Sequence, residues 1–256
     1  MASVFVTGSS DGIGLETARQ LAGGGHRVVL HARNDGKAAD AARAVPEAAG
    51  VAVGDLSVIT GIRQAAESAH ALGPYDAVIH NAGVGSASAR RATADGLEHI
   101  FAVNVLAPYL LTALMPLPSR LIYLSSGLQS GGRVDLDDLQ WVRRPWNGSQ
   151  AYSDSKLYDA MLAFAVARRY PQVLSNAVDP GWIKTKMGGY GAPGELSVGA
   201  DTPVWLATSA DPGAQVSGRF FQSRKDMRAN PAAYDTRLQE GLLAACAKLA
   251  DTELPG

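Results

Sequence analysis

The stretch Ser3–Gly14, which reads SVFVTGSSDGIG, decides how this chain begins to fold. Its β-branched and aromatic start, Ser3–Thr7, predicts a buried strand, and the residues from Ile13 to Ala22 have the spacing of a helix. Glycines fill the turn between the two. A strand, a glycine turn and a helix N-terminus form an anion site, because backbone N–H groups and the positive end of the helix dipole face one point. We therefore expect a pyrophosphate to bind here.

Three glycines determine the conformation that we expect for this turn. Gly8 permits the tight turn, Gly12 lets phosphates approach the backbone, and Gly14 allows the helix to pack closely on the strand. The intervals between them are four and then two residues, which departs from the general G-x-G-x-x-G of dinucleotide folds. The alternative interpretation is that these glycines only form a turn.

Outward from this stretch, short apolar runs alternate with amphipathic segments. The expected strands are Arg27–His31, Val51–Gly54, Tyr75–His80, Arg120–Ser125, Val173–Val178 and Arg219–Phe221. The expected helices are Lys37–Ala44, Ile59–Ala71, Asp95–Met115, Tyr152–Arg169, Thr202–Thr208 and Ala232–Ala250. Apolar strands separated by helices predict an α/β fold of the Rossmann type. We expect a doubly wound parallel sheet of about seven strands, with helices on both faces, in one domain over residues 1–256.

Composition excludes several classes of protein. The chain has 256 residues, 46% of them hydrophobic and 18% charged, which is enough apolar content for a large core. A formal net charge of −1 gives no electrostatic reason to bind nucleic acid or an anionic membrane. One cysteine, Cys246, excludes an internal disulfide, and the five histidines lack metal-ligand spacing, so we expect no metal. Without a leader or membrane-span pattern, the expected location is the cytoplasm.

The glycine spacing resembles that of the short-chain dehydrogenase/reductase family. The later motifs also occur in the same order as in this family. Asp55–Leu56 follows the third expected strand, and His80–Gly83 (HNAG) resembles the family's Asn-Asn-Ala-Gly after the fourth. Asp179–Thr185 (DPGWIKT) resembles the family's Pro-Gly segment beside the nicotinamide. The resemblance extends from Val4 to about Phe221.

The resemblance implies a nicotinamide dinucleotide cofactor. In the family, the Asp after the third strand lies beside the adenine, and the Asn of the fourth-strand motif stabilises the central sheet. The cofactor-binding residues that it implies are Gly8, Ser10, Gly12, Ile13, Gly14, Arg33, Asp55, Leu56, Asn81, Ala82, Gly83, Tyr152, Lys156, Pro180, Gly181, Ile183 and Thr185.

The motif that indicates catalysis is Tyr152-Ser-Asp-Ser-Lys156. Residues four apart share one helix face, so the two side chains are expected to be neighbours. A tyrosine with its ordinary pKa near 10 is a poor acid or base at neutral pH, but a nearby ammonium favours the phenolate. The alternative is an ordinary Tyr beside a solvated Lys. Family context favours Tyr152 as general acid/base, with Lys156 also holding the ribose hydroxyls.

Two further residues complete the implied catalytic set. Ser126, at the end of the expected strand, aligns with the family serine that polarises the substrate oxygen, and Ser125 is the alternative because the two are adjacent. Asn104 aligns with a family Asn that holds a water in a proton relay to Lys156; alone it would be interpreted as a buried, satisfied polar residue. The implied reaction moves a hydride between nicotinamide C4 and a carbonyl or carbinol carbon while Tyr152 transfers the proton.

The segment 127–150 is longer than in compact family members and resembles the retinol-dehydrogenase-like branch. Its length predicts a lid or functional insert. Asp135, Asp137 and Asp138 are better explained as a solvated loop or helix cap than as paired catalytic carboxylates. Trp141 and Trp146 either cover substrate or pack the insert.

Two expectations concern the substrate side and assembly. The glycine-containing loop 185–201 is expected to border a partly apolar substrate site, and a carbonyl or alcohol is the expected substrate. The family commonly assembles through its two long central helices. Here those helices are Asp95–Met115 and Tyr152–Arg169, so the resemblance implies a homodimer or homotetramer.

The second strand informs the choice of cofactor. NAD-specific folds place an acidic residue near this strand end, but this chain has His31, Ala32 and then Arg33. A guanidinium can pair with a 2′-phosphate, which favours NADP over NAD. Asp11 argues against this, because NADP-preferring members often carry a basic residue just before the middle glycine; Asp11 can instead cap the helix. A different class of function, a catalytically silent dinucleotide-sensing regulatory protein, is the alternative to an NADP(H)-dependent carbonyl reductase or alcohol dehydrogenase.

Overall fold

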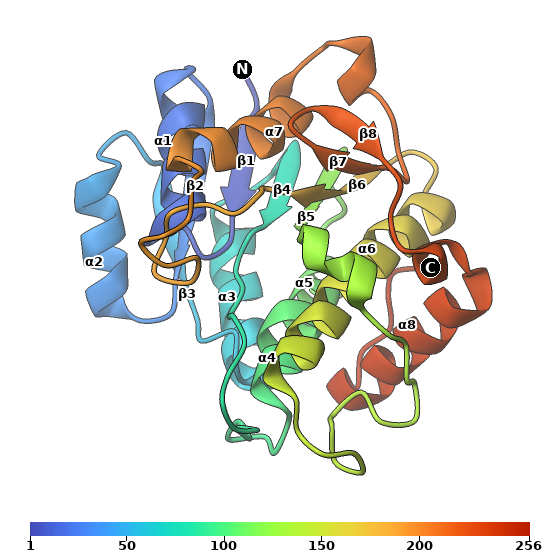
Figure 1. The fold of residues 1–256 in the computed structure, drawn as a ribbon. Helices are drawn as coiled ribbons and strands as arrows, with labels where there is room; N and C mark the ends of the chain where they lie inside the picture. Colours follow the sequence, from blue (N-terminus) through green and yellow to red (C-terminus); the bar gives the residue numbers. More distant parts are fainter.

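The computed structural model describes residues 1–256 and places every strand in one sheet (Figure 1). The strand order is β3-β2-β1-β4-β5-β6-β7-β8, and all neighbours pair in parallel except β7 and β8. The strands are β1 (Ser3–Val6), β2 (Arg27–Ala32), β3 (Gly50–Val53), β4 (Ala77–His80), β5 (Arg120–Leu124), β6 (Leu174–Asp179), β7 (Phe220–Gln222) and β8 (Lys225–Met227). The predicted Rossmann-type sheet is thus confirmed, with one short antiparallel edge strand beyond the seven expected.

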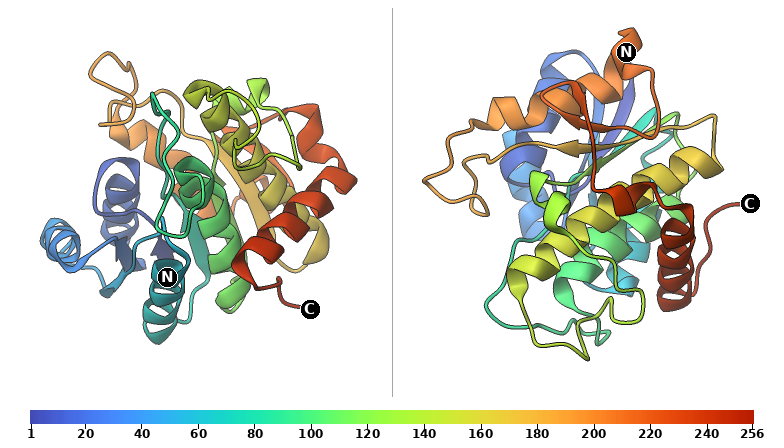
Figure 2. Two further views of the ribbon diagram at one scale, coloured as in Figure 1. Left: turned by 90° about the horizontal axis from the view of Figure 1, so that it is seen from below. Right: turned by 45° about the vertical axis from the view of Figure 1, so that its right-hand side comes forward.

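Helices cover both faces of the sheet (Figures 1 and 2). One layer contains α1 (Gly12–Gly23), α2 (Asp35–Ala44) and α7 (Leu196–Thr208). The other contains α3 (Ile59–Ala71), α4 (His99–Phe101), a π-helical turn (Ala102–Leu106), α5 (Ala107–Leu114), α6 (Gly148–Arg169) and α8 (Thr236–Ala250). Short 3₁₀ turns occupy Gly127–Gly131, Pro212–Ala214 and Pro231–Tyr234.

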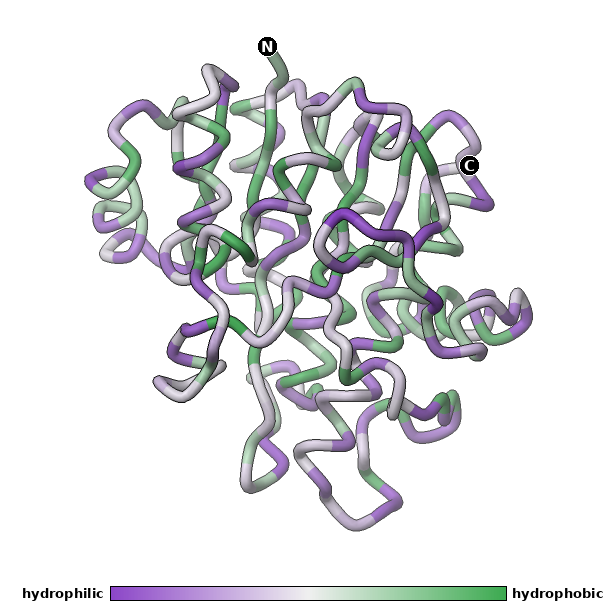
Figure 3. Tube along the Cα trace, turned by 45° about the horizontal axis from the view of Figure 1, so that its top comes forward, coloured by the Kyte–Doolittle hydropathy of each residue, from purple (hydrophilic) through white to green (hydrophobic).

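The alternation of side chains along the strands explains why both faces carry helices. In β1, Phe5 contributes to the core under α3, α5 and α6, whereas Val4 and Val6 contribute to the core under α1 and α7. All three side chains are fully buried. A strand that is apolar on both sides cannot face water on either, so it needs a helical layer on each face. The hydropathy trace accordingly runs green through the central strands (Figure 3).

The strand order places the crevice of the molecule. The chain winds outward from β1 to β3, then returns to β4 on the other side of β1. Loops that leave neighbouring strands in opposite directions open a crevice at the carboxyl ends of β1 and β4, where open α/β sheets bind ligands. No helix of the structure has the length and apolar content to cross a membrane.

The helix expected over Asp95–Met115 begins later than predicted. Glu98 caps α4, since its carboxylate accepts the N–H groups of Ile100 and Phe101 at 2.9 and 2.8 Å. Asp95 instead caps α3, by accepting the Ile59 N–H at 2.6 Å. The middle of the predicted helix is the π-helical turn. The contact that takes Asp95 out of the predicted helix joins residues 36 positions apart in the sequence, so helical periodicity alone could not place the start.

The predicted loop 185–201 is also corrected. Helix α7 begins at Leu196, so the last six residues of that range are helical and only 185–195 form the loop. We call the residues 182–195 the substrate-side loop below. At the other end of the chain, the predicted helix Ala232–Ala250 is split: Asp235 caps α8 by accepting the N–H groups of Arg237 and Leu238.

No residue of the insert 127–150 lines the cavity at the carboxyl ends of the central strands. The insert begins as a 3₁₀ turn and ends as the first turn of α6. Asp138 is buried and accepts the N–H groups of Val142, Arg143 and Arg144, so it caps an internal turn rather than lying in solvent. Trp141 packs with Trp146, at 5.7 Å between ring centroids. The two tryptophans therefore pack the insert.

The surface of α6 is covered within the chain itself. Fourteen of its residues, among them the run from Asp154 to Val166, are buried. Helix α8 lies against α6 and α5, and the C-terminal segment adds hydrogen bonds from Tyr109 to Thr252 and from Tyr170 to Pro255. Helix α8 and the C-terminal segment thus cover part of the helix surface through which the family commonly assembles.

Candidate active site

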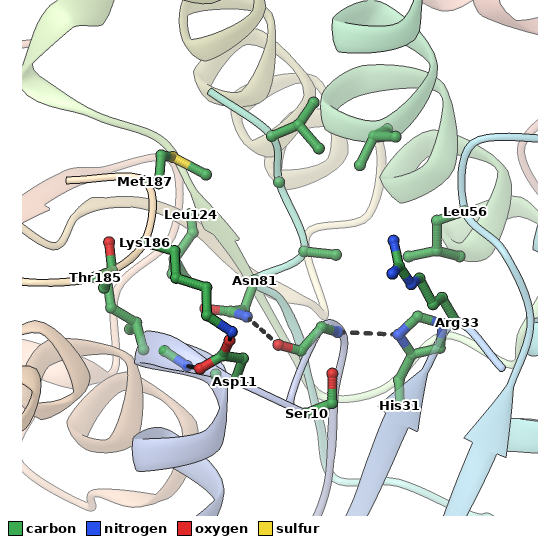
Figure 4. A pocket seen from close by; sticks show the side chains of 18 of the residues that line it. Ser10, Asp11, His31, Arg33, Leu56, Asn81, Leu124, Thr185, Lys186 and Met187 are labelled. Carbon is green, nitrogen blue, oxygen red and sulfur yellow. Dashed lines mark hydrogen bonds and ion pairs between the residues drawn. The ribbon is translucent and has the colours of Figure 1, made fainter. Parts of the chain in front are cut away.

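A cavity of about 430 Å³ lies at the carboxyl ends of the central strands (Figure 4). Its floor is the turn Gly8–Gly14 between β1 and α1. Its walls come from the ends of β2 and β4, from α6, and from the substrate-side loop. The crevice that the strand order predicts is thus bordered by the segments that carry the sequence motifs.

Two glycines of the turn, Gly8 and Gly14, have no space for a side chain. Gly8 has φ +63°, and a Cβ there would lie 2.8 Å from the Ala82 Cα. A Cβ at Gly14 would lie 2.2 Å from the Asn81 amide nitrogen. Gly12 has φ +57° and begins α1, whose first N–H groups have no partner within the helix. These features fit a pyrophosphate seated over the start of α1.

His31 braces this turn from β2. The Gly8 N–H donates to His31 Nδ1 at 3.0 Å, so the ring proton lies on Nε2, which donates to the Gly54 carbonyl at 2.9 Å. Burial lowers the pKa of His31 to about 4, which keeps the ring neutral and able to accept at Nδ1. The imidazole thus links β1, β2 and β3 beneath the cavity.

Asn81 ties the end of β4 to the end of β1. Its side chain donates to the carbonyls of Thr7 and Gly8 at 2.8 and 3.2 Å, and its own N–H donates to the Thr7 hydroxyl at 2.9 Å. These bonds hold the two strands together at the point where the strand order reverses. His80, which replaces the first Asn of the family motif, turns away from the cavity and bonds Thr112.

One end of the cavity carries Arg33, His31 and Leu56 (Figure 4). Arg33 is exposed and follows β2 directly. Asp55 lies beside Leu56 and accepts the Ser57 N–H at 2.9 Å. This end therefore combines a guanidinium, a carboxylate and a buried apolar side chain.

Tyr152 and Lys156 lie on the cavity wall, on one face of α6. The Lys156 Nζ is 5.8 Å from the Tyr152 ring centroid. It donates to the Leu124 carbonyl and to Asp159 Oδ2, each at 2.8 Å. Burial opposes the charge of Lys156, but Asp159 and Tyr152 outweigh burial, and the pKa of Lys156 is raised. The ammonium is therefore fixed beside the Tyr152 ring.

The two adjacent serines have different environments. Ser125 is buried and lines the cavity, yet its hydroxyl donates to the Lys156 carbonyl at 2.6 Å. Ser126 is half-buried and does not line the cavity; its oxygen accepts the Leu128 N–H at 3.2 Å and caps the 3₁₀ turn. The hydroxyl proton of Ser125 is thus engaged, whereas that of Ser126 is not.

Asn104 lies in the π-helical turn, behind the cavity wall. Its side chain accepts the Val84 N–H at 2.8 Å and donates to Ser155 Oγ at 2.9 Å. Gly83 lies between Asn104 and Lys156, since a Cβ there would be 3.4 Å from Asn104 Oδ1 and 3.5 Å from Lys156 Nζ. Asn104 is therefore a neighbour of Lys156 with a satisfied side chain.

The substrate-side loop reaches across the cavity to both ends of the site. Lys186 forms an ion pair with Asp11, and the hydrogen bond from Lys186 holds the pKa of Asp11 below its usual range (Figure 4). Met187 lies with its sulfur 3.9 Å from the Tyr152 hydroxyl. The loop thus contacts the glycine turn and the Tyr152 oxygen through consecutive residues.

The structure brings most of the sequence-predicted site residues into one cavity. Those that line it are Gly8, Ser10, Gly12, Ile13, Gly14, Arg33, Asp55, Leu56, Asn81, Ala82, Gly83, Tyr152, Lys156, Pro180 and Thr185. Asn104, Ser126, Gly181 and Ile183 are near it but do not line it. Ile183 is buried against α7 beside Gly199.

Sequence reasoning missed several neighbours of the site. Lys186 and Val84 line the cavity, but no local pattern marks either one. Asp159, which pairs with Lys156, had a usable signal: it is a carboxylate three residues after Lys156, on the same face of the helix.

The family comparison agrees with this fold and cavity, which define a protein of the Rossmann dinucleotide-binding class. A model of the short chain dehydrogenase family matches residues 2–194. An uncharacterized oxidoreductase from Emericella nidulans is 43% identical over the full length of both chains. A short-chain dehydrogenase from Gibberella zeae is 38% identical and covers 100% of this chain and 99% of its own. Human retinol dehydrogenase 13 is 33% identical over 99% of this chain and 86% of its own.

Comparison with solved structures also finds similar folds. A crystal structure of an uncharacterized protein from Mycobacterium paratuberculosis superposes with a TM-score of 0.87 and 27% identity, over 100% of this chain and 96% of that one. A blue fluorescent protein from a metagenomic library, in complex with NADPH, superposes with a TM-score of 0.69 and 26% identity, over 86% of this chain and 95% of that one. The chain belongs to the short-chain dehydrogenase family of oxidoreductases, whose members bind NAD(H) or NADP(H), and it resembles the retinol-dehydrogenase-like branch, as the sequence predicts.

Proposed function

We propose that this protein is an NADP(H)-dependent oxidoreductase that interconverts a carbonyl compound and the corresponding primary or secondary alcohol. The observation that carries the proposal is the placement of Tyr152 and Lys156 on the wall of the same cavity whose floor is the glycine turn. A phosphate seat and a proton-transfer pair that share one cavity are what a nicotinamide-dependent hydride transfer requires.

Residues of the turn would hold the cofactor. The backbone from Gly8 to Gly14 would face the pyrophosphate, and Lys156, which lines the cavity, would bind the ribose hydroxyls. The bound nicotinamide supplies or accepts the hydride. The protein contributes orientation and the movement of the proton.

Proton transfer falls to Tyr152. Its hydroxyl borders the cavity near Met187 and donates a proton to the substrate oxygen as the carbonyl is reduced, or removes one from an alcohol in the reverse reaction. Lys156 stabilises the phenolate form through its buried ammonium. Ser125 lines the cavity, but its hydroxyl proton is engaged with α6. Ser126 lies beside the cavity with a free hydroxyl proton, so we assign the contact with the substrate oxygen to Ser126. Asn104, beside Lys156, belongs to the path by which Tyr152 regains its proton.

Two charges support NADP over NAD. Arg33 is the basic side chain at the adenosine end of the cavity and can form a bidentate pair with a 2′-phosphate. Asp11, which would repel that phosphate, is paired with Lys186 and its charge is compensated. The presence of an acidic residue just before the middle glycine therefore argues less strongly against NADP.

The test is consumption of NADPH and NADH by the purified protein with a panel of aldehydes and ketones. We expect turnover with NADPH, and a loss of at least about a hundredfold in Tyr152→Phe, because the ring stays and the transferable proton is lost. Cofactor affinity should be unchanged in this variant. Near-normal turnover in Tyr152→Phe would refute the mechanism. Tight NADPH binding without turnover of any carbonyl would identify a dinucleotide sensor instead.

A further inference from the structure

Helix α6 carries a buried carboxylate that the family resemblance does not explain. Asp159 Oδ2 lies 2.8 Å from Lys156 Nζ, and the two side chains are only 4% and 6% exposed. The same ammonium donates to the Leu124 carbonyl at 2.8 Å and faces the Tyr152 ring. Two of its three N–H groups are thus used by the protein, and the remaining direction is toward Tyr152 and the cavity.

The other groups around Asp159 are neutral. Tyr123 faces it from β5, and the Tyr123 hydroxyl is hydrogen-bonded to Thr112 at 2.9 Å. Burial raises the pKa of Tyr123, and the charge of Asp159 adds to this rise. His80 on β4 packs against Tyr123 with 4.7 Å between ring centroids, and burial keeps it uncharged. Lys156 is therefore the one cation that compensates Asp159.

We propose that Asp159 is a positioning residue of the active site: as the buried counter-ion of Lys156, it fixes the ammonium beside Tyr152 and sets the pH at which the Tyr152–Lys156 pair loses a proton. The inference rests on the proposed function, because it assigns Asp159 a role in proton transfer by Tyr152. It extends the predicted catalytic set by one residue that acts through Lys156.

The direction of the effect follows from charge. With Asp159 ionised, the three groups Asp159, Lys156 and protonated Tyr152 sum to zero, and proton loss leaves a net negative charge in a buried site. Without the carboxylate, the remaining pair starts with one positive charge and becomes neutral on proton loss. Proton loss from a positive cluster is easier than from a neutral one, whichever of the two groups gives up its proton.

Asp159 can also titrate within the working range. Burial raises its pKa to about 6, in spite of the lowering by Lys156. Its charge is therefore present at neutral pH and lost under mildly acidic conditions. The ion pair is a pH-dependent part of the site rather than a fixed one.

Asp159→Asn tests the proposal, because it keeps the shape and one acceptor for Lys156 while removing the charge. Carbonyl reduction needs both Tyr152 and Lys156 protonated, so the alkaline limb of the kcat profile should move to lower pH by about one unit. Asp154→Asn is the matched control: it removes a second buried carboxylate from α6, one that pairs with Arg144 instead. We expect no displacement of the limb in that control. An unmoved limb in Asp159→Asn, or equal displacements in both variants, would overturn the proposal.

A second measurement does not depend on turnover. The protein alone, labelled with ¹³C at the tyrosine ring carbon that bears the hydroxyl, is titrated by NMR, and the Tyr152 signal is identified by its loss in Tyr152→Phe. Its first titration step should fall by about one pH unit in Asp159→Asn. If the first titration step of this signal is unchanged in Asp159→Asn, the proposed role of Asp159 is wrong. A protein that reduces no carbonyl but shows the lowered step refutes the proposed function, while it still shows that the charge of Asp159 controls proton loss from the Tyr152–Lys156 pair. If Asp159→Asn does not fold, Asp159→Ser removes the same charge with a smaller side chain and is measured in the same way.

Discussion

Arg33 illustrates how one side chain can select between two cofactors. It lies exposed at one end of the cavity and follows β2 directly, at the position where NAD-specific folds place a carboxylate (Figure 4). Arg33→Ala should weaken NADPH binding by roughly tenfold to a hundredfold, or about 1.5–3 kcal/mol for a charge-assisted hydrogen bond. NADH binding should change little. Fluorescence titration of the two reduced cofactors provides the comparison, and equal losses for both would show that Arg33 does not contact the 2′-phosphate.

Ser125 and Ser126 allow a separation of stability from catalysis. Ser125→Ala removes a buried hydrogen bond to α6, so it should cost about 1 kcal/mol and lower Tm by about 3 °C. Ser126→Ala leaves this bond in place and should lower turnover by about a hundredfold, the usual effect of losing one donor to a developing oxyanion. Thermal melts and initial rates on both variants test the pair. The reverse pattern would assign the substrate oxygen to Ser125.

Local motifs predicted much of the site because each is contained within a few residues. The glycines of the turn, Asn81, and the pair Tyr152 and Lys156 all come from short patterns, and they line one cavity. Lys186 could not be found in this way, since its ion pair with Asp11 joins residues that are 175 positions apart. Residues of this kind become neighbours only through the fold.

At the scale of elements, the sequence predicted those whose boundaries are set locally. Helix α3 was predicted over Ile59–Ala71, which are the bounds observed. The start of α4 was misplaced because Asp95, its expected first residue, instead caps α3. The start of α7 was expected at Thr202, whereas the helix begins six residues earlier, at Leu196. Strand β8 was missed because its three residues are exposed and form a strand only by pairing with β7. A three-residue exposed segment has no periodicity that could indicate a strand.

The insert depends on one buried carboxylate. Asp138 accepts three consecutive backbone N–H groups and lies 3.6 Å from the Arg144 guanidinium. Although burial opposes ionisation, these partners lower the pKa of Asp138. Asp138→Ala leaves them unsatisfied, so we expect a loss of about 3 kcal/mol and a fall in Tm of roughly 6–12 °C. Asp137→Ala, at the exposed neighbouring position, is the control and should melt like the wild type; similar melts for both variants would contradict this role.

At the scale of the whole molecule, the packing of α8 predicts the oligomeric state. Arg168 and Arg169 at the end of α6 pair with Glu240 of α8, and α6 is buried along most of its length. A partner copy would need this same surface to form the assembly that is common in the family. We therefore expect a monomer in light scattering at assay concentration. A stable dimer would require a different interface.

Two buried histidines give the whole fold a pH dependence. Burial lowers the pKa of His31 to about 4 and that of His80 to about 3, against 6.5 in the unfolded chain. Unfolding therefore takes up protons below about pH 6.5, so the stability they contribute is present above that pH and is lost as the pH falls toward 4. Each histidine contributes on the order of 3 kcal/mol to this loss by pH 4. Asp159 acts in the opposite sense, because its pKa in the folded state is raised to about 6, but one carboxylate does not offset two histidines.

His80→Asn tests this account. His80 Nδ1 is buried without a hydrogen-bond partner, so a proton there would add a charge that no neighbour accepts. Urea unfolding at about pH 7 and about pH 4.5 should show a smaller loss of stability on acidification in His80→Asn than in the wild type, whatever the cost of the substitution itself. His70→Asn, at an exposed position on α3, should retain the full loss. If His80→Asn loses as much stability between the two pH values as the wild type does, protonation of His80 is not what destabilises the fold in acid.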